Sequence, residues 1–380
     1  MIRLLHVLKH RSTLLLNKAK VSAKLLKNAK SITDQKSYYP DMPHKSRKEI
    51  LKDQLYFVRK YGNYEKFYFP YGFDRKEMVR KRMCSEYVIN EDDFLKKVDY
   101  HNNHINRKQG RFSGRCIISD KFYFYLFLKS LGYPTPSILY YTRNQGLFYN
   151  IDNQYVIKQW GGVRDILVHD MDAFAKPYGG QLGDGAFAIK VDNSKVYVNG
   201  DLVDNTDDLI KTFTNTNYIV QNRIVQHPQM DRLCSTSLNT IRLHTLITEN
   251  EEIIAFGAAL RMGREGSAVD NWAKGGIIVG VDMNTGKLLK TGFIKPPYGT
   301  TVTEHPDNGL VFETFQIPFF KEAVEMAKEL HSKLYRIHSI GWDIAISENG
   351  PVFIEGNSLW EISLLQTAVG GLKEIEKYFN

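Results

Sequence analysis

The strongest constraint on the fold lies near the end of the chain, in residues 340–357. Two runs rich in β-branched and aromatic residues flank the turn sequence Ser347-Glu-Asn-Gly-Pro351. Glycine permits a positive φ in a turn, and proline cannot donate a hydrogen bond to a neighbouring strand. This stretch therefore predicts a β-hairpin.

The pairing within this hairpin decides which side chains lie together. If the strands close symmetrically about Asn349, Asp343 faces Glu355. Because side chains alternate between the faces of a strand, acidic and amide groups then share one face and apolar side chains share the other. The polar set is Asp343, Glu355 and Asn357; the other expected pairs are Ile346 with Val352 and Gly341 with Asn357; the apolar set is Trp342, Ile344, Ile346, Val352 and Ile354.

Two carboxylates directly opposite each other repel, so this arrangement is costly unless a cation lies between them. Carboxylate oxygens with an amide oxygen as the third ligand suit magnesium that is held together with substrate phosphates. A hairpin whose acids simply face water is the alternative. The spacing alone does not decide between a magnesium site and a solvated hairpin.

A second candidate site lies in residues 173–187, where a predicted buried strand ends at Lys176 and a glycine-rich loop follows. Clustered glycines let backbone N–H groups approach an anion, and a neighbouring lysine adds a positive charge for phosphate. The alternative is a flexible hairpin loop with one exposed lysine. No Gly-Lys-Ser/Thr sequence opens a helix here, so the motif is not a Walker loop. The glycines of the loop are Gly179, Gly180, Gly183 and Gly185.

Two further strands, predicted in residues 237–247 and 253–261, carry Arg242 and Arg261. Burying a guanidinium group without a partner is expensive. We therefore expect each arginine to meet either a buried acid or an anionic ligand.

The amino-terminal part of the chain is expected to be helical and basic. Residues 1–30 place leucines among lysines and arginines without any acid, which predicts an amphipathic helix that lies either on an anionic membrane surface or on the body of the protein. With residues 31–45 as a linker, residues 1–45 form a basic segment, and residues 46–109 form a helical region. Within it, the periodic stretches at residues 47–61 and 74–87 predict helices. Its aromatic side chains fit a hydrophobic core better than base stacking, so nucleic acid is not an expected partner.

Composition excludes two classes of protein. No apolar run approaches the roughly eighteen residues that span a bilayer, which excludes an integral membrane protein. Three widely spaced cysteines argue against a disulfide scaffold and fit a reducing compartment, so we expect a cytoplasmic protein. The net charge of +9 favours anionic partners.

Taken in order, these motifs resemble the ATP-grasp superfamily. The resemblance rests on Lys121 in an Asp-Lys helix, Lys176 before the glycine-rich loop, the connector at Gln221, the strand arginines and the closing Glu355-Gly-Asn357. Four segments are similar to the family called sugar-transfer associated ATP-grasp, namely Ser237-Leu-Asn-Thr-Ile-Arg242, Val269-Asp-Asn271, Gly275-Gly276 and Gly341-Trp-Asp-Ile-Ala345. The resemblance covers roughly residue 110 to the end.

The resemblance implies an α+β ATP-grasp domain in residues 110–380, with two lobes at about 120–220 and 221–380 that clasp ATP. It implies ATP and two magnesium ions, and a carboxylate–amine ligase that works through an acyl phosphate on a carboxyl-bearing sugar or polymer precursor. The implied roles are phosphate binding by Lys121 and Lys176 under the loop of Gly179, Gly180, Gly183 and Gly185, adenine binding at Gln221, Asn222 and Ile224, metal binding by Asp343, Glu355 and Asn357, and charge neutralisation by Arg242 and Arg261.

Two other functions stay open on the sequence. A kinase that phosphorylates a hydroxyl group would use the same fold. A nucleotide-sensing protein that turns nothing over and docks at the inner face of the cell membrane would use the basic amino terminus.

Overall fold

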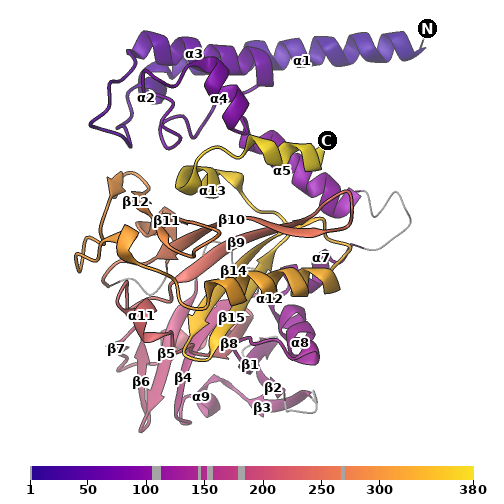
Figure 1. The fold of residues 1–380 in the computed structure, drawn as a ribbon. Helices are drawn as coiled ribbons and strands as arrows, with labels where there is room; N and C mark the ends of the chain where they lie inside the picture. The colour runs from indigo at the N-terminus through magenta and orange to yellow at the C-terminus, as the bar shows by residue number, and fades with distance from the viewer. Residues whose placement is uncertain (1, 105–112, 144–146, 152–156, 179–184, 267–269) are drawn as a thin grey trace.

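The computed structural model describes residues 2–104, 113–143, 147–151, 157–178, 185–266 and 270–380. Within these ranges helices gather in the amino-terminal part, and the strands form two antiparallel sheets (Figure 1). This is the α+β architecture that the sequence predicts. In the same ranges, no helix combines the length and the apolar character that crossing a membrane requires.

The amino-terminal third is helical. Helix α3 occupies Arg47–Tyr61, as predicted, because Ser46 and Glu49 form a reciprocal capping box at its start. Helix α4 covers only Arg80–Glu86 and is therefore shorter than the stretch of residues 74–87 that the periodicity favours. The other elements of this part are α1 (Ile2–Lys27), α2 (Ala29–Thr33), α5 (Glu91–Asp99), a π-helical turn (Tyr100–His104), α7 (Arg115–Ser119) and α8 (Lys121–Leu131).

The expected linker, residues 31–45, begins inside helix α2, and its residues 34–45 are irregular but packed. Tyr38 is 2% exposed, and its ring centroid lies 6.1 Å from that of Phe293 in the second sheet. Most aromatic residues between positions 56 and 73 also lie in the apolar cluster of this region, as the core interpretation predicts. These rings stabilise the amino-terminal helices against the second sheet.

The first sheet has the strand order β3-β2-β1-β8-β4-β5-β6-β7. Helices α9 (Val163–Ile166) and α10 (Asp207–Asn215) pack on one of its faces, and α8 packs on the other through Tyr125 and Ile219. The strands are β1 (Ile138–Arg143), β2 (Leu147–Ile151), β3 (Ile157–Gly161), β4 (Met171–Pro177), β5 (Phe187–Asp192), β6 (Lys195–Val198), β7 (Asp201–Leu202) and β8 (Tyr218–Asn222).

The second sheet has the order β13-β12-β11-β10-β9-β14-β15 and lies between helices α1 to α5 and the first sheet (Figure 1). Helix α12 (Phe320–Lys333) covers one face, and α13 (Ile362–Val369) covers part of the other. The strands are β9 (Thr240–Ile247), β10 (Ile253–Met262), β11 (Ile277–Val281), β12 (Leu288–Ile294), β13 (Thr301–Val302), β14 (Ser339–Ser347) and β15 (Gly350–Asn357), and the short helices are α11 (Pro228–Asp231) and the 3₁₀ turns Trp272–Lys274, Phe312–Thr314 and Lys373–Phe379.

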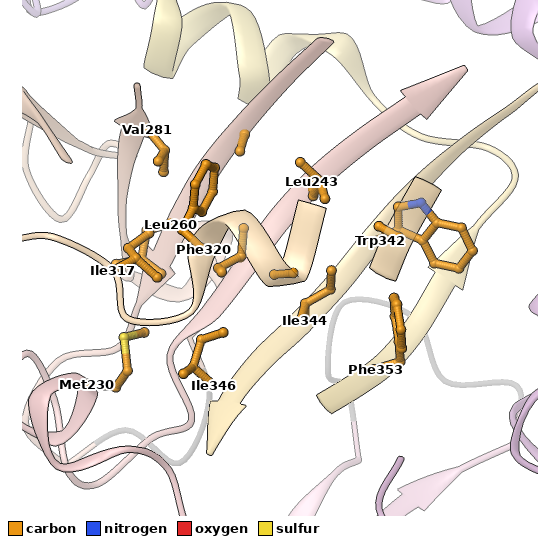
Figure 2. Close-up of a cluster of buried hydrophobic side chains, with 14 of the residues drawn as sticks. Met230, Leu243, Leu260, Val281, Ile317, Phe320, Trp342, Ile344, Ile346 and Phe353 are labelled. Carbon is orange, nitrogen blue, oxygen red and sulfur yellow. The ribbon is translucent and has the colours of Figure 1, made fainter. Parts of the chain in front are cut away.

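The largest apolar cluster fills the space under α12. Figure 2 shows Trp342, Ile344 and Ile346 of β14 in this cluster, together with Leu243 of β9 and Leu260 of β10. The predicted apolar face of β14 is therefore confirmed for these three residues.

The closing hairpin forms with a tighter turn than predicted. Residues 348–349 alone join the strands, so Ile346 faces Pro351 rather than Val352. A β-bulge, where the register shifts between Asp343 and Ile344, then compensates for the turn. The predicted pairs that hold are Asp343 with Glu355 and Gly341 with Asn357.

The same bulge changes which side chains of β15 reach the core. Phe353 is buried in the cluster with Trp342, with ring centroids 5.5 Å apart. Val352 and Ile354, expected on the apolar side, are half-buried and lie outside this cluster. The prediction for these two residues is wrong because the sequence does not reveal where the strand bulges.

A close backbone contact joins the carboxyl-terminal segment to helix α4. A Cβ atom at Gly371 would lie 2.2 Å from the carbonyl oxygen of Glu86. Gly371→Ala should therefore lower the free energy of unfolding by about 1–3 kcal/mol, because backbone must shift. Chemical denaturation measures this change. Gly162→Ala is the control, since its nearest neighbour, Asp165 Oδ2, is 3.7 Å away, and an equal loss in both variants would contradict the close contact.

Candidate functional site

Three strands of the second sheet bring Arg242, Arg261 and Asp343 together on one face. Arg242 on β9 and Asp343 on β14 are direct cross-strand neighbours. The Arg242 guanidinium donates from Nε to Asp343 Oδ1 at 2.5 Å and from Nη2 to Oδ2 at 3.2 Å. Nη2 of Arg261, from β10, lies 3.2 Å from the same Oδ2. One carboxylate thus holds two arginines.

The charge of Asp343 is set by these two arginines. Its side chain is buried, and burial alone would raise its pKa. The nearby guanidinium groups of Arg242 and Arg261 outweigh burial, so the pKa of Asp343 falls to about 2. Each strand arginine meets a buried acid, which is one of the two outcomes expected from the sequence. Cations of the chain itself therefore already lie beside the paired carboxylates.

Arg261 also belongs to a second ion pair, with Asp270. Its Nη2 lies 3.3 Å from Asp270 Oδ1, and its Nε donates to Thr240 Oγ1 at 3.1 Å. The Thr240 hydroxyl in turn donates to Asp270 Oδ2. Burial raises the pKa of Asp270, and Arg261 opposes that rise. Neither Asp270 nor Thr240 is among the site residues expected from the sequence, because a lone acid in a polar loop has no spacing that reveals its partner.

Glu355 and Asn357 lie at the edge of this charged cluster. Both are half-buried, and Asn357 Nδ2 donates to Glu355 Oε1 at 3.3 Å. Both oxygens of Asp343 already accept hydrogen bonds, so Glu355 and the amide oxygen of Asn357 are the more accessible ligands. Two carboxylates and one amide oxygen are hard ligands and fit magnesium by their chemistry. Over the ranges that the structure describes, no cluster of three or more His, Cys, Asp or Glu is placed to hold a metal ion.

Lys176 approaches the acids of the second sheet from the first sheet. It lies at the end of β4, as predicted, and is half-buried. Burial lowers the pKa of Lys176, the charge of Glu355 raises it, and the charge of Lys121 lowers it again. Lys121, the first residue of α8, therefore lies near enough to Lys176 for their charges to interact.

The remaining predicted nucleotide ligands are only partly described. Gly179, Gly180 and Gly183 lie outside the described residues. Gly185 has a φ of +72°, and its carbonyl oxygen accepts a hydrogen bond from Tyr218 Oη at 3.0 Å. In the connector, Gln221 is buried and donates to the carbonyl oxygen of Pro136 at 3.3 Å, Asn222 is exposed and Ile224 is half-buried.

Comparison with known families gives one match. Residues 100–377 match the profile of the family described as sugar-transfer associated ATP-grasp. The comparison with curated proteins gives no match.

Several solved structures are similar to the chain at a distance. An N5-carboxyaminoimidazole ribonucleotide synthetase bound to ADP is 10% identical with a TM-score of 0.39, over 73% of this chain and 59% of that one. D-alanine–D-alanine ligase from Helicobacter pylori is 13% identical with a TM-score of 0.38, over 74% and 68% of the two chains. The corresponding ligase from Bacillus anthracis, complexed with ATP, is 12% identical with a TM-score of 0.36, over 71% and 67%. Similarities this distant assign no activity to the chain.

The double ion pair of Asp343 leads to a prediction about stability. Asp343→Asn removes the negative charge between two largely buried guanidinium groups. In the presence of a chelator, this change should lower the free energy of unfolding by about 3–5 kcal/mol, because unpaired buried charges remain. Denaturant titration measures the loss. Glu355→Gln is the matched control and should cost about 1 kcal/mol or less; equal losses would contradict the role of the arginines.

The same ion pair predicts a pH dependence. The pKa of Asp343 is lower in the folded protein, about 2, than its ordinary value of 3.8. Its contribution to stability is therefore complete above about pH 4 and is lost as the pH falls toward 2. The stability difference between the natural protein and Asp343→Asn should narrow over this range. A difference that stays constant down to pH 2 would contradict the lowered pKa.

Proposed function

Because the chain belongs to the sugar-transfer associated ATP-grasp family, we propose that it is an ATP-dependent carboxylate–amine ligase. One observation carries the proposal: Lys176 of the first sheet lies near enough to Glu355 and Asp343 of the second sheet for their charges to interact. A ligase that holds ATP between two lobes needs cations for phosphates on one lobe and acids for magnesium on the other. The charge distribution between the two sheets agrees with this requirement.

Lys176 and Lys121 are the proposed phosphate ligands. The positive charges of Lys176 and Lys121 repel each other, and burial further disfavours the charged form of Lys176. A polyphosphate between them would remove the repulsion and compensate the buried charge. Adenine binding at Gln221, Asn222 and Ile224 and loop closure by Gly179, Gly180, Gly183 and Gly185 belong to the same proposal.

Glu355, Asn357 and Asp343 are the proposed magnesium ligands. Magnesium would neutralise charge on the transferring phosphoryl group when it is bound. Glu355 and Asn357 offer the accessible oxygens, and Asp343 stays ionised because its pKa is low. Two ions, as expected from the family, would require all three residues.

The proposed reaction has two balanced steps. An oxygen of the substrate carboxylate attacks the γ-phosphorus of ATP, the bond to ADP breaks, and an acyl phosphate forms. The amine then attacks the acyl carbon, loses a proton, and releases inorganic phosphate. The chain supplies orientation and charge neutralisation, and no covalent nucleophile is needed.

Arg242 and Arg261 are the proposed cations for the reacting carboxylate and phosphoryl oxygens. Each is held by Asp343, and Arg261 also by Asp270, so their guanidinium groups are positioned before substrate binds. Preorganised charge of this kind lowers a barrier without reorganisation during the reaction. The proposed substrates, a carboxyl-bearing sugar or surface-polymer precursor and an amine, rest on the description of the family and on the net charge of +9.

Trapping the acyl intermediate tests the proposed reaction. The protein should form hydroxamates from ATP, magnesium, hydroxylamine and a member of a panel of uronic and amino acids. Colorimetric detection of hydroxamate together with ADP release measures the reaction. ADP release with a stable phosphorylated product and no amine requirement would instead identify a hydroxyl kinase, and ATP binding without any turnover would identify a nucleotide sensor.

Substitution of Lys176 tests the nucleotide site. Lys176→Ala should weaken ATP binding at least several-fold and leave thermal stability nearly unchanged, because burial already disfavours the charged side chain. Calorimetric titration with ATP measures the affinity. Lys190→Ala, at an exposed lysine of the same sheet, is the control. Unchanged ATP affinity with a large drop in melting temperature would assign Lys176 a structural role only.

A further inference from the structure

Helix α1 has one packed side and one exposed apolar side. Helix α1 contacts α3, Leu25 is buried, and Lys18 Nζ donates to the carbonyl oxygen of Arg59 in α3 at 2.7 Å. In contrast, Leu15, Leu16 and Leu26 are 68%, 62% and 54% exposed. The sequence left two alternatives, a helix packed on the protein or one on a membrane surface. In the described part of α1, one side packs on the protein and another side exposes leucines that a membrane surface could accept.

The exposed leucines lie together on the helix surface. Leu15 and Leu26 are eleven residues apart, which is close to three full turns, so they point in nearly the same direction. Leu16 lies beside them. Three lysines, all exposed, follow on the neighbouring side and are Lys20, Lys24 and Lys27. An apolar strip next to a row of lysines is the arrangement of a helix that lies in a membrane interface.

The charge of this segment selects its partner. Asp34 is the first acidic residue of the chain, so no acid of α1 offsets its lysines. A second copy of the helix would bring two rows of lysines together without compensating acids, and nucleic acid would leave the leucines in water. An anionic lipid surface satisfies both features, since headgroups meet the lysines and acyl chains meet the leucines.

The position of helix α1 in the molecule also leaves it accessible to a flat membrane surface. It forms the outer edge of the molecule with α3, at the end opposite the first sheet (Figure 1). A membrane along α1 would therefore lie on the side of the molecule away from the first sheet (Figure 1).

We propose that α1 docks the protein on anionic phospholipid bilayers, with its axis in the membrane plane. Leu15, Leu16 and Leu26 enter the boundary between headgroups and acyl chains. Lys20, Lys24 and Lys27 contact the phosphate groups. The docking does not depend on the proposed ligase activity.

Vesicle flotation of the full-length protein tests this surface. The protein should float with vesicles of phosphatidylcholine mixed with phosphatidylglycerol at low salt, and much less with phosphatidylcholine alone. Replacing all three leucines by glutamine should reduce the bound fraction at least about tenfold, because the apolar contact is lost. Each lysine replaced by glutamine should reduce binding about fivefold.

Matched variants separate docking from a general effect of charge. Lys20→Glu, Lys24→Glu and Lys27→Glu together should abolish flotation, whereas the same change at Lys190, Lys211 and Lys321, which are exposed on other elements, should not. Unchanged melting temperatures show that each variant is folded. Equal flotation of the leucine variant and the natural protein would overturn the proposal. So would equal binding to neutral vesicles, or leucine-dependent dimerisation in light scattering without vesicle binding.

Discussion

The carboxylate of Asp343 bonds three central strands of the second sheet to one another through their side chains. It accepts two hydrogen bonds from Arg242 on β9 and pairs with Arg261 on β10. A buried ion is expensive, and this one is tolerated because two cations and their hydrogen bonds compensate it. The cluster also fixes where the two guanidinium groups lie. Stability and the electrostatics of the candidate site therefore depend on the same contacts.

One face of the second sheet packs under α12, and the other face carries both the charged cluster and part of the amino-terminal core. Along β9, Leu243 points to the core under α12, while Arg242 and Leu246 share the opposite face. Leu246 lies under the amino-terminal helices, and Arg242 lies at the part of the face that Lys176 approaches. His244 lies between these two residues on β9 and is buried, with its ring centroid 4.8 Å from that of Trp360. Burial and the nearby charge of Arg242 lower the pKa of His244 to about 3. A neutral histidine thus separates the charged cluster from the amino-terminal core.

Helix α8 connects the two sheets. Phe124 and Leu128 pack in the core of the second sheet, whereas Tyr125 packs against the first. Asp120 caps the helix and places Lys121 at its first turn, where its charge interacts with Lys176. A shift of one sheet relative to the other would therefore move Lys121 relative to Asp343. The geometry of the candidate site is coupled to the packing of this single helix.

Features that depend on near neighbours along the chain could be predicted from the amino-acid sequence: the capped helices α3 and α8, the closing hairpin and the residue types of the candidate site. The opposition of Asp343 and Glu355 was predicted correctly although the register beside the turn differs by one residue from the assumed one, because a bulge cancels the difference. The pairing of Asp343 with Arg242, 101 residues away, and the presence of Asp270 in the cluster follow from the arrangement of the strands in space. Turn and cap rules act over a few residues, whereas these contacts depend on the order of strands in the sheet, which local patterns do not encode.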